Sequence, residues 1–137
     1  MKYLVIGLGN FGSTLATALT DMGHSVIGVD CNEHCIEEIK DRIDLAYIMD
    51  ATERVSLRSL PLDEIDCVIV AIGQSMDSSL RTVASLKELK VKNIIARALD
   101  NTHSSILRAM DIKKILIPES YAARIFAEKI LSNDSGE

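Results

Sequence analysis

Three glycines near the amino end of the chain stand at a spacing that suits a phosphate-binding turn. Gly7, Gly9 and Gly12 follow the pattern G-x-G-x-x-G, directly after an apolar run and directly before a helical pattern. In that context the first glycine permits a tight turn, the second lets the backbone approach a pyrophosphate, and the third lets the helix pack closely on the strand. Free N–H groups at the start of the helix then supply a site for negative charge. The alternative is a glycine turn that only shapes the fold. The predicted loop comprises Gly7, Leu8, Gly9, Asn10, Phe11 and Gly12.

An acidic residue follows the loop at the distance expected for a ribose ligand. Asp30 ends the second apolar run, 18 residues after Gly12, and Cys31 beside it is assigned to the same site. A carboxylate there accepts hydrogen bonds from a ribose 2′-OH and repels a 2′-phosphate. The sequence therefore favours NAD, or an unphosphorylated adenosine ribose, over NADP. We expect this carboxylate to lie at a solvent-facing rim.

Polar and small residues follow three further apolar runs, where the next strands are expected to end. They are Asp50-Ala51-Thr52, Ala71-Ile72-Gly73 and Arg97. In an open parallel sheet, ligands bind outside the carboxyl ends of the strands, so these groups should meet at the glycine loop. Asp50 would reach the adenine amino group or a ribose, and Arg97 would offer a guanidinium to phosphate. The alternatives are that Asp50 is only a helix N-cap and that Arg97 only pairs with a surface acid.

Six short apolar runs, separated by helical patterns, must position these groups. The runs are Tyr3–Ile6, Ser25–Val29, Leu45–Met49, Cys67–Ile72, Asn93–Ala96 and Lys114–Ile117. Each is nearly continuously apolar, which is typical of strands buried on both faces of a parallel sheet. With right-handed crossovers, the alternation predicts a doubly wound α/β Rossmann sheet of six parallel strands in the order 3-2-1-4-5-6. The N-cap candidates are Asn32 for the second helix, and Asn101 or Thr102 for the fifth.

The carboxyl end of the chain follows a different pattern. An amphipathic segment spans residues 121–131 and leads into a polar tail. A final helix with no strand after it must dock on its own sheet or on a neighbouring subunit. We therefore divide the chain into a nucleotide-binding domain at 1–119 and a helix with a polar tail at 120–137. The apolar side of the helix carries Ala122, Ile125, Phe126 and Ile130.

Composition limits the class of protein. With 137 residues, 47% of them apolar, and a net charge of −5, the chain suits one compact domain. Its acidity argues against nucleic-acid binding, which normally requires a basic face. The longest apolar stretch, Cys67–Ile72, is far shorter than the ~20 residues that span a bilayer, so we expect no direct membrane insertion. An odd number of cysteines and no recognisable signal peptide favour a reducing cytoplasm.

Groups for catalysis are scarce. The six strands and their helices use nearly the whole chain, which leaves no substrate domain for a dehydrogenase. We expect His24, His34 and His103 to be structural or solvent-exposed. Cys31, His34 and Cys35 form a dense cluster, but a fourth zinc ligand is not evident. The sequence therefore predicts a protein that binds rather than catalyses.

The order of these motifs resembles a known family: the N-terminal (TrkA-N, or RCK/KTN) domain of the nucleotide-binding regulatory subunits of Trk and Ktr potassium-uptake systems. The resemblance implies a domain that binds NAD(H), ATP, ADP or AMP and self-associates as a dimer or ring. It also implies gating of a membrane-embedded potassium transporter or channel through ligand-dependent conformational change. The protein would then be cytoplasmic and peripheral to the inner face of the membrane. The matching stretches are 5–12, 23–24, 29–30, 50–52, 68–73, 94–98 and 117–119.

The resemblance also implies a role for each matching residue. Asp30 would bind the ribose, Glu119 would lie near a cation at a subunit interface, and segment 121–131 would be the crossover helix that packs on the partner. Asn10 stands where many members carry an arginine, which favours NAD(H) or an AMP-containing ligand over ATP-specific switching. Members usually continue into a second, smaller ligand-binding domain, which has no counterpart in these 137 residues. Phosphates would contact Gly7, Gly9, Gly12 and Arg97, the adenine side would contact Asp50 and Ala51, and Ala71, Ile72 and Gly73 would border the nucleotide.

Two other functions remain open at this point. One is a small NAD-dependent oxidoreductase whose site is completed by a partner chain, which hydride transfer lost on Arg97→Ala would favour. The other is a structural dimerisation domain whose glycine loop holds no ligand. A protein without any thermal shift in the presence of nucleotides would favour that second alternative.

Overall fold

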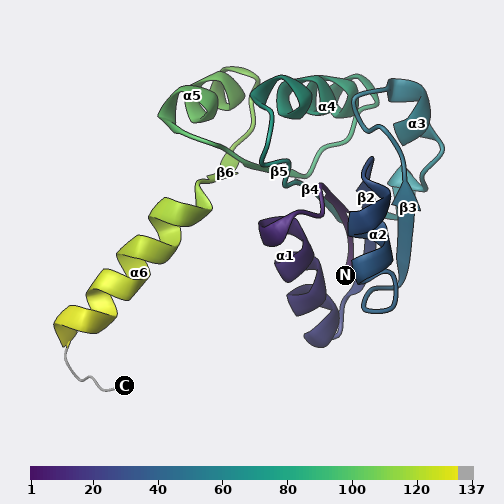
Figure 1. The fold of residues 1–137 in the computed structure, drawn as a ribbon. Coiled ribbons are helices and arrows are strands. Elements are labelled where there is room, and N and C mark those ends of the chain that lie inside the picture. The colour runs from purple at the N-terminus through teal and green to yellow at the C-terminus, as the bar shows by residue number, and fades with distance from the viewer. Residues whose placement is uncertain (133–137) are drawn as a thin grey trace.

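The computed structural model describes residues 1–132, and its core is a six-stranded parallel sheet in the order β3-β2-β1-β4-β5-β6 (Figure 1). This order confirms the predicted doubly wound Rossmann sheet. The strands are β1 (Lys2–Ile6), β2 (Ser25–Asp30), β3 (Leu45–Ile48), β4 (Cys67–Val70), β5 (Ile94–Arg97) and β6 (Lys114–Leu116). The helices are α1 (Asn10–Asp21), α2 (Glu33–Ile39), α3 (Arg54–Arg58), the short 3₁₀ helix η1 (Leu62–Glu64), α4 (Met76–Glu88), α5 (Asn101–Ala109) and α6 (Pro118–Ser132).

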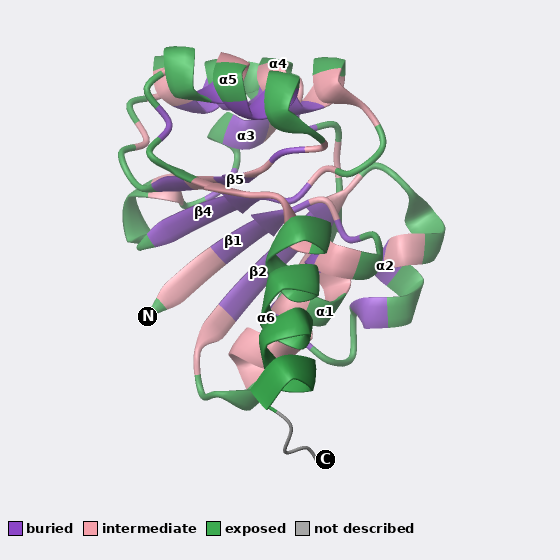
Figure 2. Ribbon diagram, turned by 90° about the vertical axis from the view of Figure 1, so that its left-hand side faces the viewer, coloured by how far each residue is buried: buried purple, intermediate pink, exposed green. Residues whose placement is uncertain are grey.

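Helices cover both faces of the sheet and so divide the core into two apolar clusters. Helices α3, α4 and α5 lie on one side of the sheet, and α1 and α2 lie on the other (Figure 1). On the first side Leu57, Leu86 and Leu107 are fully buried against the sheet. On the second side Ala16 and Ile39 fill the same role. The central strands are buried between these layers (Figure 2), because their β-branched side chains pack on both faces.

The edge strand β3 departs from the prediction that every strand is buried on both faces. Leu45 is 48% exposed and Ile48 is 54% exposed. The prediction was wrong here because β3 pairs only with β2 and therefore lies at the end of the sheet. A continuous apolar run does not distinguish a central strand from an edge strand.

The observed helix caps confirm the predicted cap residue for one helix and correct it for another. Asn32 caps α2 as predicted, with its Oδ1 accepting the His34 N–H at 2.8 Å. For α5, however, the cap is Asp100, whose Oδ1 accepts the His103 N–H at 2.8 Å. The prediction of Asn101 or Thr102 was therefore late by one or two positions.

Helix α6 leads away from the sheet (Figure 1) and does not dock on it. Residues 119–132 are all exposed, including Phe126 at 64% and Ile130 at 62%. Of the two expected docking places, the chain's own sheet is therefore excluded, and the apolar side of α6 is uncovered in a single chain.

The predicted division of the chain into a nucleotide-binding domain and a helix with a polar tail, at 119/120, stays a prediction. Most of the predicted polar tail, 133–137, lies outside the described residues. In residues 1–132, no helix is both long and apolar enough to cross a membrane.

Candidate functional site

The glycine loop between β1 and α1 lies against the ends of the neighbouring strands. The Gly7 N–H donates to the Val29 carbonyl at 2.9 Å, and the Ala71 N–H donates to the Ile6 carbonyl at 2.7 Å. These bonds tie the loop to the end of β2 on one side and to the end of β4 on the other. The carboxyl ends of the central strands therefore meet at the loop, as the sequence predicts.

Two of the three glycines are required by the fold itself. Gly7 has a φ of +97°, and a Cβ there would lie 2.9 Å from the backbone nitrogen of Ile72. A Cβ at Gly12 would run into the carbonyl oxygen of Gly7, because α1 packs directly on the loop. These positions have the roles expected of the first and third glycines: a tight turn and a close helix contact.

Gly9 differs from the other two because its surroundings are open. No atom lies within 4 Å of the Cβ position at Gly9, which is the N-cap of α1. No side chain caps this helix, so the N–H groups of its first turn have no intrahelical or capping partner among the described residues. An open backbone beside free N–H groups is the arrangement that binds phosphate.

Asp30 holds the glycine loop in place. Its Oδ2 accepts the Leu8 N–H at 2.7 Å, and its Oδ1 accepts the Asn32 N–H at 2.8 Å. Asp30 is half-buried, so the expected place of its carboxylate at a solvent-facing rim stays a prediction. Each oxygen keeps acceptor capacity for a ribose hydroxyl. Asp30 therefore contributes to the shape of the loop as well as to the predicted ribose contact.

Arg97, at the end of β5, joins three parts of the site. Its Nη2 donates to Glu119 Oε2 at 3.0 Å, and its Cζ lies 5.6 Å from the centre of the Phe11 ring. The guanidinium also lies over Gly73, where a Cβ would be only 3.0 Å from Cζ. The Nε is buried and has no hydrogen-bond partner among the described residues. In this arrangement Arg97 does pair with an acid, as one alternative held, but that acid belongs to α6 and not to the sheet.

Asp50 and its neighbours form a turn at the end of β3. The Asp50 Oδ1 accepts the Thr52 N–H at 3.0 Å and the Thr52 hydroxyl. Asp50 is not a helix N-cap, because the N-cap position of α3 is Glu53, which makes no side-chain capping hydrogen bond. Ala51 is buried, so its side chain supports the turn from the core. The contacts of these residues with adenine stay a prediction.

Neither Glu119, the predicted cation ligand, nor the cluster of Cys31, His34 and Cys35 forms a metal site among the described residues. Within residues 1–132, no three His, Cys, Asp or Glu side chains are grouped so that they could hold a metal ion. The carboxylate of Glu119 is bound to Arg97, and its role at a subunit interface stays a prediction. Cys31 is exposed beside Asp30, whereas burial, and then the charge of Asp30, raise the pKa of the half-buried Cys35 thiol.

His103 is structural, as expected, and it anchors the loop that follows Arg97. Its side chain is fully buried; Nδ1 accepts the Leu99 N–H at 2.9 Å, and Nε2 lies 3.1 Å from the Ser79 hydroxyl. Because Nδ1 accepts, the neutral ring carries its proton on Nε2 and donates to Ser79. Burial lowers the pKa of His103 below 6.5, although the nearby Asp100 charge acts in the opposite direction.

This buried histidine makes the stability of the protein depend on pH. The unfolded chain binds a proton at His103 at a higher pH than the folded chain, so stability is fully present above about pH 6.5 and falls as the pH drops below it. We expect urea unfolding to give a lower free energy at pH 5.5 than at pH 7.5. The His103→Gln variant, which lacks this group, should show a smaller difference. Equal differences in the two proteins would contradict this role of His103.

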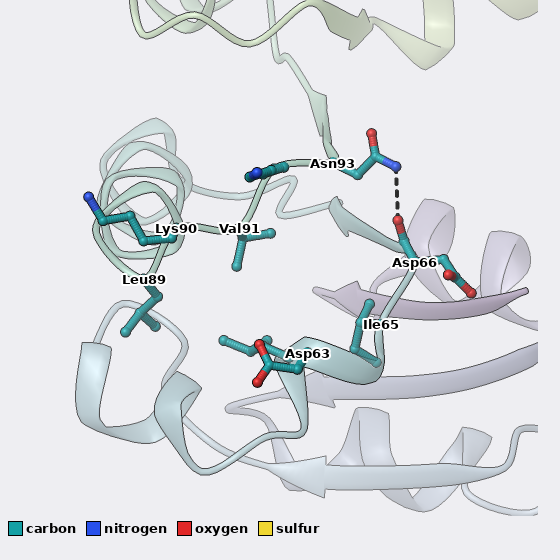
Figure 3. A pocket seen from close by; sticks show the side chains of 9 residues that line it. Asp63, Ile65, Asp66, Leu89, Lys90, Val91 and Asn93 are labelled. Carbon is teal, nitrogen blue, oxygen red and sulfur yellow. Dashed lines mark hydrogen bonds between the residues drawn. The ribbon is translucent and has the colours of Figure 1, made fainter.

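A separate hollow lies at the opposite, amino-terminal edge of the sheet. It has a volume of about 260 Å³ between η1 and the connection from α4 to β5. Figure 3 shows Ile65, Leu89 and Val91 directed toward this hollow, and the Asn93 amide bonded to the Asp66 carbonyl at 2.9 Å. None of the predicted site residues lines it, so it is not part of the candidate nucleotide site.

Comparison with known proteins places this geometry in a family. The family model of the TrkA-N domain matches residues 3–118. Ktr system potassium uptake protein C of Bacillus subtilis (strain 168) is 35% identical over 133 residues, which cover 97% of this chain and 60% of that protein. Ktr system potassium uptake protein A of the same organism is 37% identical over 118 residues, which cover 86% of this chain and 53% of that protein. The chain thus spans between half and two thirds of the length of these relatives.

A solved structure agrees with these matches. The NAD(P)-binding domain of an exopolyphosphatase-related protein from Archaeoglobus fulgidus superposes with a TM-score of 0.82 and 26% identity, covering 95% of this chain and 97% of that one. The family model covers most of the described residues and includes the glycine loop, Asp30 and Arg97. The chain therefore belongs to the TrkA-N domain family.

Proposed function

We propose that this chain is a nucleotide-binding regulatory domain, rather than an enzyme, and that it controls a potassium transporter or channel in the membrane. The observation that carries the proposal is the open backbone at Gly9, beside the uncapped start of α1 and the carboxylate of Asp30. The names of the Ktr relatives supply the link to potassium uptake. The protein would act on the cytoplasmic side, held at the membrane by its transporter partner.

The ligand that fits best is NAD(H) or an adenine nucleotide with a free ribose 2′-OH, such as AMP, ADP or ATP. The remaining acceptor capacity of Asp30 suits ribose hydroxyls, and its charge repels a 2′-phosphate. The phosphates would lie over Gly9 at the start of α1, where free N–H groups are available. Asn10 adds no positive charge to this loop, which favours NAD(H) or AMP over a response specific to ATP.

Arg97 links ligand binding to the position of α6. A phosphate within reach of the guanidinium competes with the Glu119 carboxylate, because both are anions that bind the same N–H donors. When Arg97 turns to phosphate, α6 loses its ion pair to the sheet. Nucleotides that bind the two arrangements with different affinity would then shift the equilibrium between them. We infer that the transporter senses this shift through α6 and its partner subunit.

The uncovered side of α6 indicates self-association as a dimer or ring. Its exposed Ile125, Phe126 and Ile130 form an apolar stripe of the kind that contacts another protein. We expect Phe126→Asp to weaken self-association at least about tenfold, since it places a charge at the centre of the apolar stripe, where a hot-spot residue is worth about 2 kcal/mol or more. Sedimentation velocity over a range of concentrations measures this effect.

Ala127→Asp provides the matched control for this prediction. Ala127 is the next residue, about 100° further round the helix, and lies outside the apolar stripe. The Ala127→Asp substitution introduces the same charge as Phe126→Asp but does so outside the apolar stripe. It should therefore leave self-association nearly unchanged. A wild-type chain that is monomeric at all concentrations, or two variants with equal effects, would contradict the proposed interface.

The regulatory role is tested in cells. Deletion of the gene should change the rate of potassium uptake, measured with a rubidium tracer, and the wild-type gene should restore it. Gly9→Val should fail to restore the rate although the protein accumulates normally. Uptake that is independent of the gene would contradict a role in potassium transport, and full rescue by Gly9→Val would contradict regulation by nucleotide.

A further inference from the structure

A second groove lies between α5, β6 and α6, away from the glycine loop. It has a volume of about 330 Å³ and an open mouth. Residues of β6, Ile117 after it, and residues of α5 and α6 line this shallow groove. The polar side chains that line it are Asn101, Ser104 and Arg108 from α5, and Ser120, Tyr121 and Arg124 from α6.

The charge of this groove is opposite to that of the chain. The net charge of the chain is −5, yet the lining includes two arginines and no aspartate or glutamate. Neither Arg108 nor Arg124 takes part in any of the ion pairs formed within residues 1–132. Two guanidinium groups that form no ion pair among the described residues, one on α5 and one on α6, provide N–H donors that match the oxygens of phosphate or carboxylate.

The start of α6 adds further donors to the same wall. The first backbone bond of the helix runs from the Tyr121 N–H to the Ile117 carbonyl at 3.0 Å. The N–H groups of Glu119 and Ser120 therefore precede the intrahelical ladder, and the positive end of the helix dipole lies there. The hydroxyls of Ser120 and Tyr121 complete a set of donors suited to an anion.

The groove stays open when the apolar side of α6 is covered. By helical spacing, Ser120 and Arg124 fall on one side of α6 and Phe126 falls on the opposite side. Tyr121 lies one turn before Ile125 and so stands at the border between the groove and the apolar stripe. A partner subunit that packs on the apolar stripe therefore leaves the side of Arg124 accessible.

We propose that this groove is a binding site for a small molecule with two or more phosphate or carboxylate groups. Two guanidinium groups on different helices favour a ligand that presents an anionic group to each. Its volume of about 330 Å³ and its open mouth suit a compact molecule that stays partly exposed to solvent. Such a ligand would hold α6 against α5.

The site would be coupled to the nucleotide, a step that rests on the proposed function. Glu119, which pairs with Arg97, directly precedes Ser120 of the groove. A ligand that fixes the first turn of α6 therefore changes the ion pair that nucleotide phosphate competes with. Linkage requires that each ligand alter the affinity of the other by the same factor.

Calorimetric titration of the full chain tests the site directly. Pyrophosphate and citrate serve as probes, and both are titrated into the Gly9→Val variant so that the glycine loop does not contribute. We expect saturable binding of at least one probe, weakened about tenfold or more by Arg108→Gln and by Arg124→Gln, since a charged hydrogen bond is worth about that factor or more. Binding of pyrophosphate alone would assign phosphate as the ligand group, and binding of citrate alone would assign carboxylate.

Arg58→Gln is the matched control, because Arg58 occupies the last turn of α3 as Arg108 occupies the last turn of α5. It should leave probe binding unchanged. No saturable binding of either probe, or an equal loss in Arg58→Gln, would overturn the proposal. The titration uses the Gly9→Val variant, in which the glycine loop is expected not to bind phosphate. A negative result for the groove is therefore distinguishable from a negative result for the proposed nucleotide site.

Discussion

Replacing Gly9 by valine should abolish measurable nucleotide binding and leave the fold intact. The backbone φ of Gly9 is −73°, and no atom lies within 4 Å of its Cβ position, so a side chain there meets only the space that a phosphate would occupy. The loss of N-cap propensity costs at most about 1 kcal/mol of stability. We expect affinity for NAD and AMP to fall about a hundredfold or more, because the phosphates can no longer approach the first turn of α1. Calorimetric titration measures the affinity, and urea unfolding measures the stability.

A graded pair of substitutions strengthens this test. Gly9→Ala places one carbon in the same space and should weaken binding less than valine does. Unchanged affinity in Gly9→Val would contradict a ligand over the glycine loop. A variant that no longer folds would contradict the open surroundings of Gly9.

Gly12→Ala should have the opposite effect, with a large loss of stability. The new Cβ would overlap the carbonyl oxygen of Gly7, which is a backbone atom and has no rotamer to escape into. α1 must therefore shift away from β1 and open the loop, at a cost of about 3 kcal/mol by analogy with overpacked cores. Urea unfolding of Gly12→Ala beside Gly9→Ala isolates this effect, since both substitutions add one methyl group at the start of the same helix. Equal stability of the two variants would show that α1 does not pack as closely as the structure indicates.

The sheet and its order were predictable because their signals are local. Each strand appears as a short apolar run, and the right-handed crossover rule leaves few ways of arranging six such runs. The glycine loop was equally predictable, since its G-x-G-x-x-G pattern lies directly between a predicted strand and a predicted helix. The exposure of β3 could not be predicted from its apolar run, because the position of a strand at the edge of a sheet depends on which strands pair.

The contacts that organise the site were harder to predict, since they join residues far apart in the chain. Asp30 was assigned to the ribose, but its bond to the Leu8 N–H depends on the exact return of β2 beside the loop. The pairing of Arg97 with Glu119 depends on where α6 begins relative to β5. The arginines of α5 and α6 gave no local motif at all, because only the packing of α5, β6 and α6 brings them to one groove.

The proposed response of α6 to ligand rests on the same contacts. Arg97 contacts the loop through Phe11 and contacts α6 through Glu119, so this one side chain connects the two. Under the proposed function, a nucleotide that reaches Arg97 would act on a helix whose apolar side is uncovered. The proposed ligand site and the proposed subunit contact would then be connected by the ion pair of Arg97 and Glu119.

Titration of the purified chain with NAD and, separately, with NADP would show whether the glycine loop and Asp30 bind a nucleotide. The two ligands differ only in the 2′-phosphate, so the comparison isolates the ribose contact assigned to Asp30. We expect saturable binding of NAD and at least about tenfold weaker binding of NADP, with the difference reduced in Asp30→Asn because the repelling charge is gone. Equal affinity for the two ligands, or no binding of either NAD or AMP by the folded chain, would contradict the proposed nucleotide site.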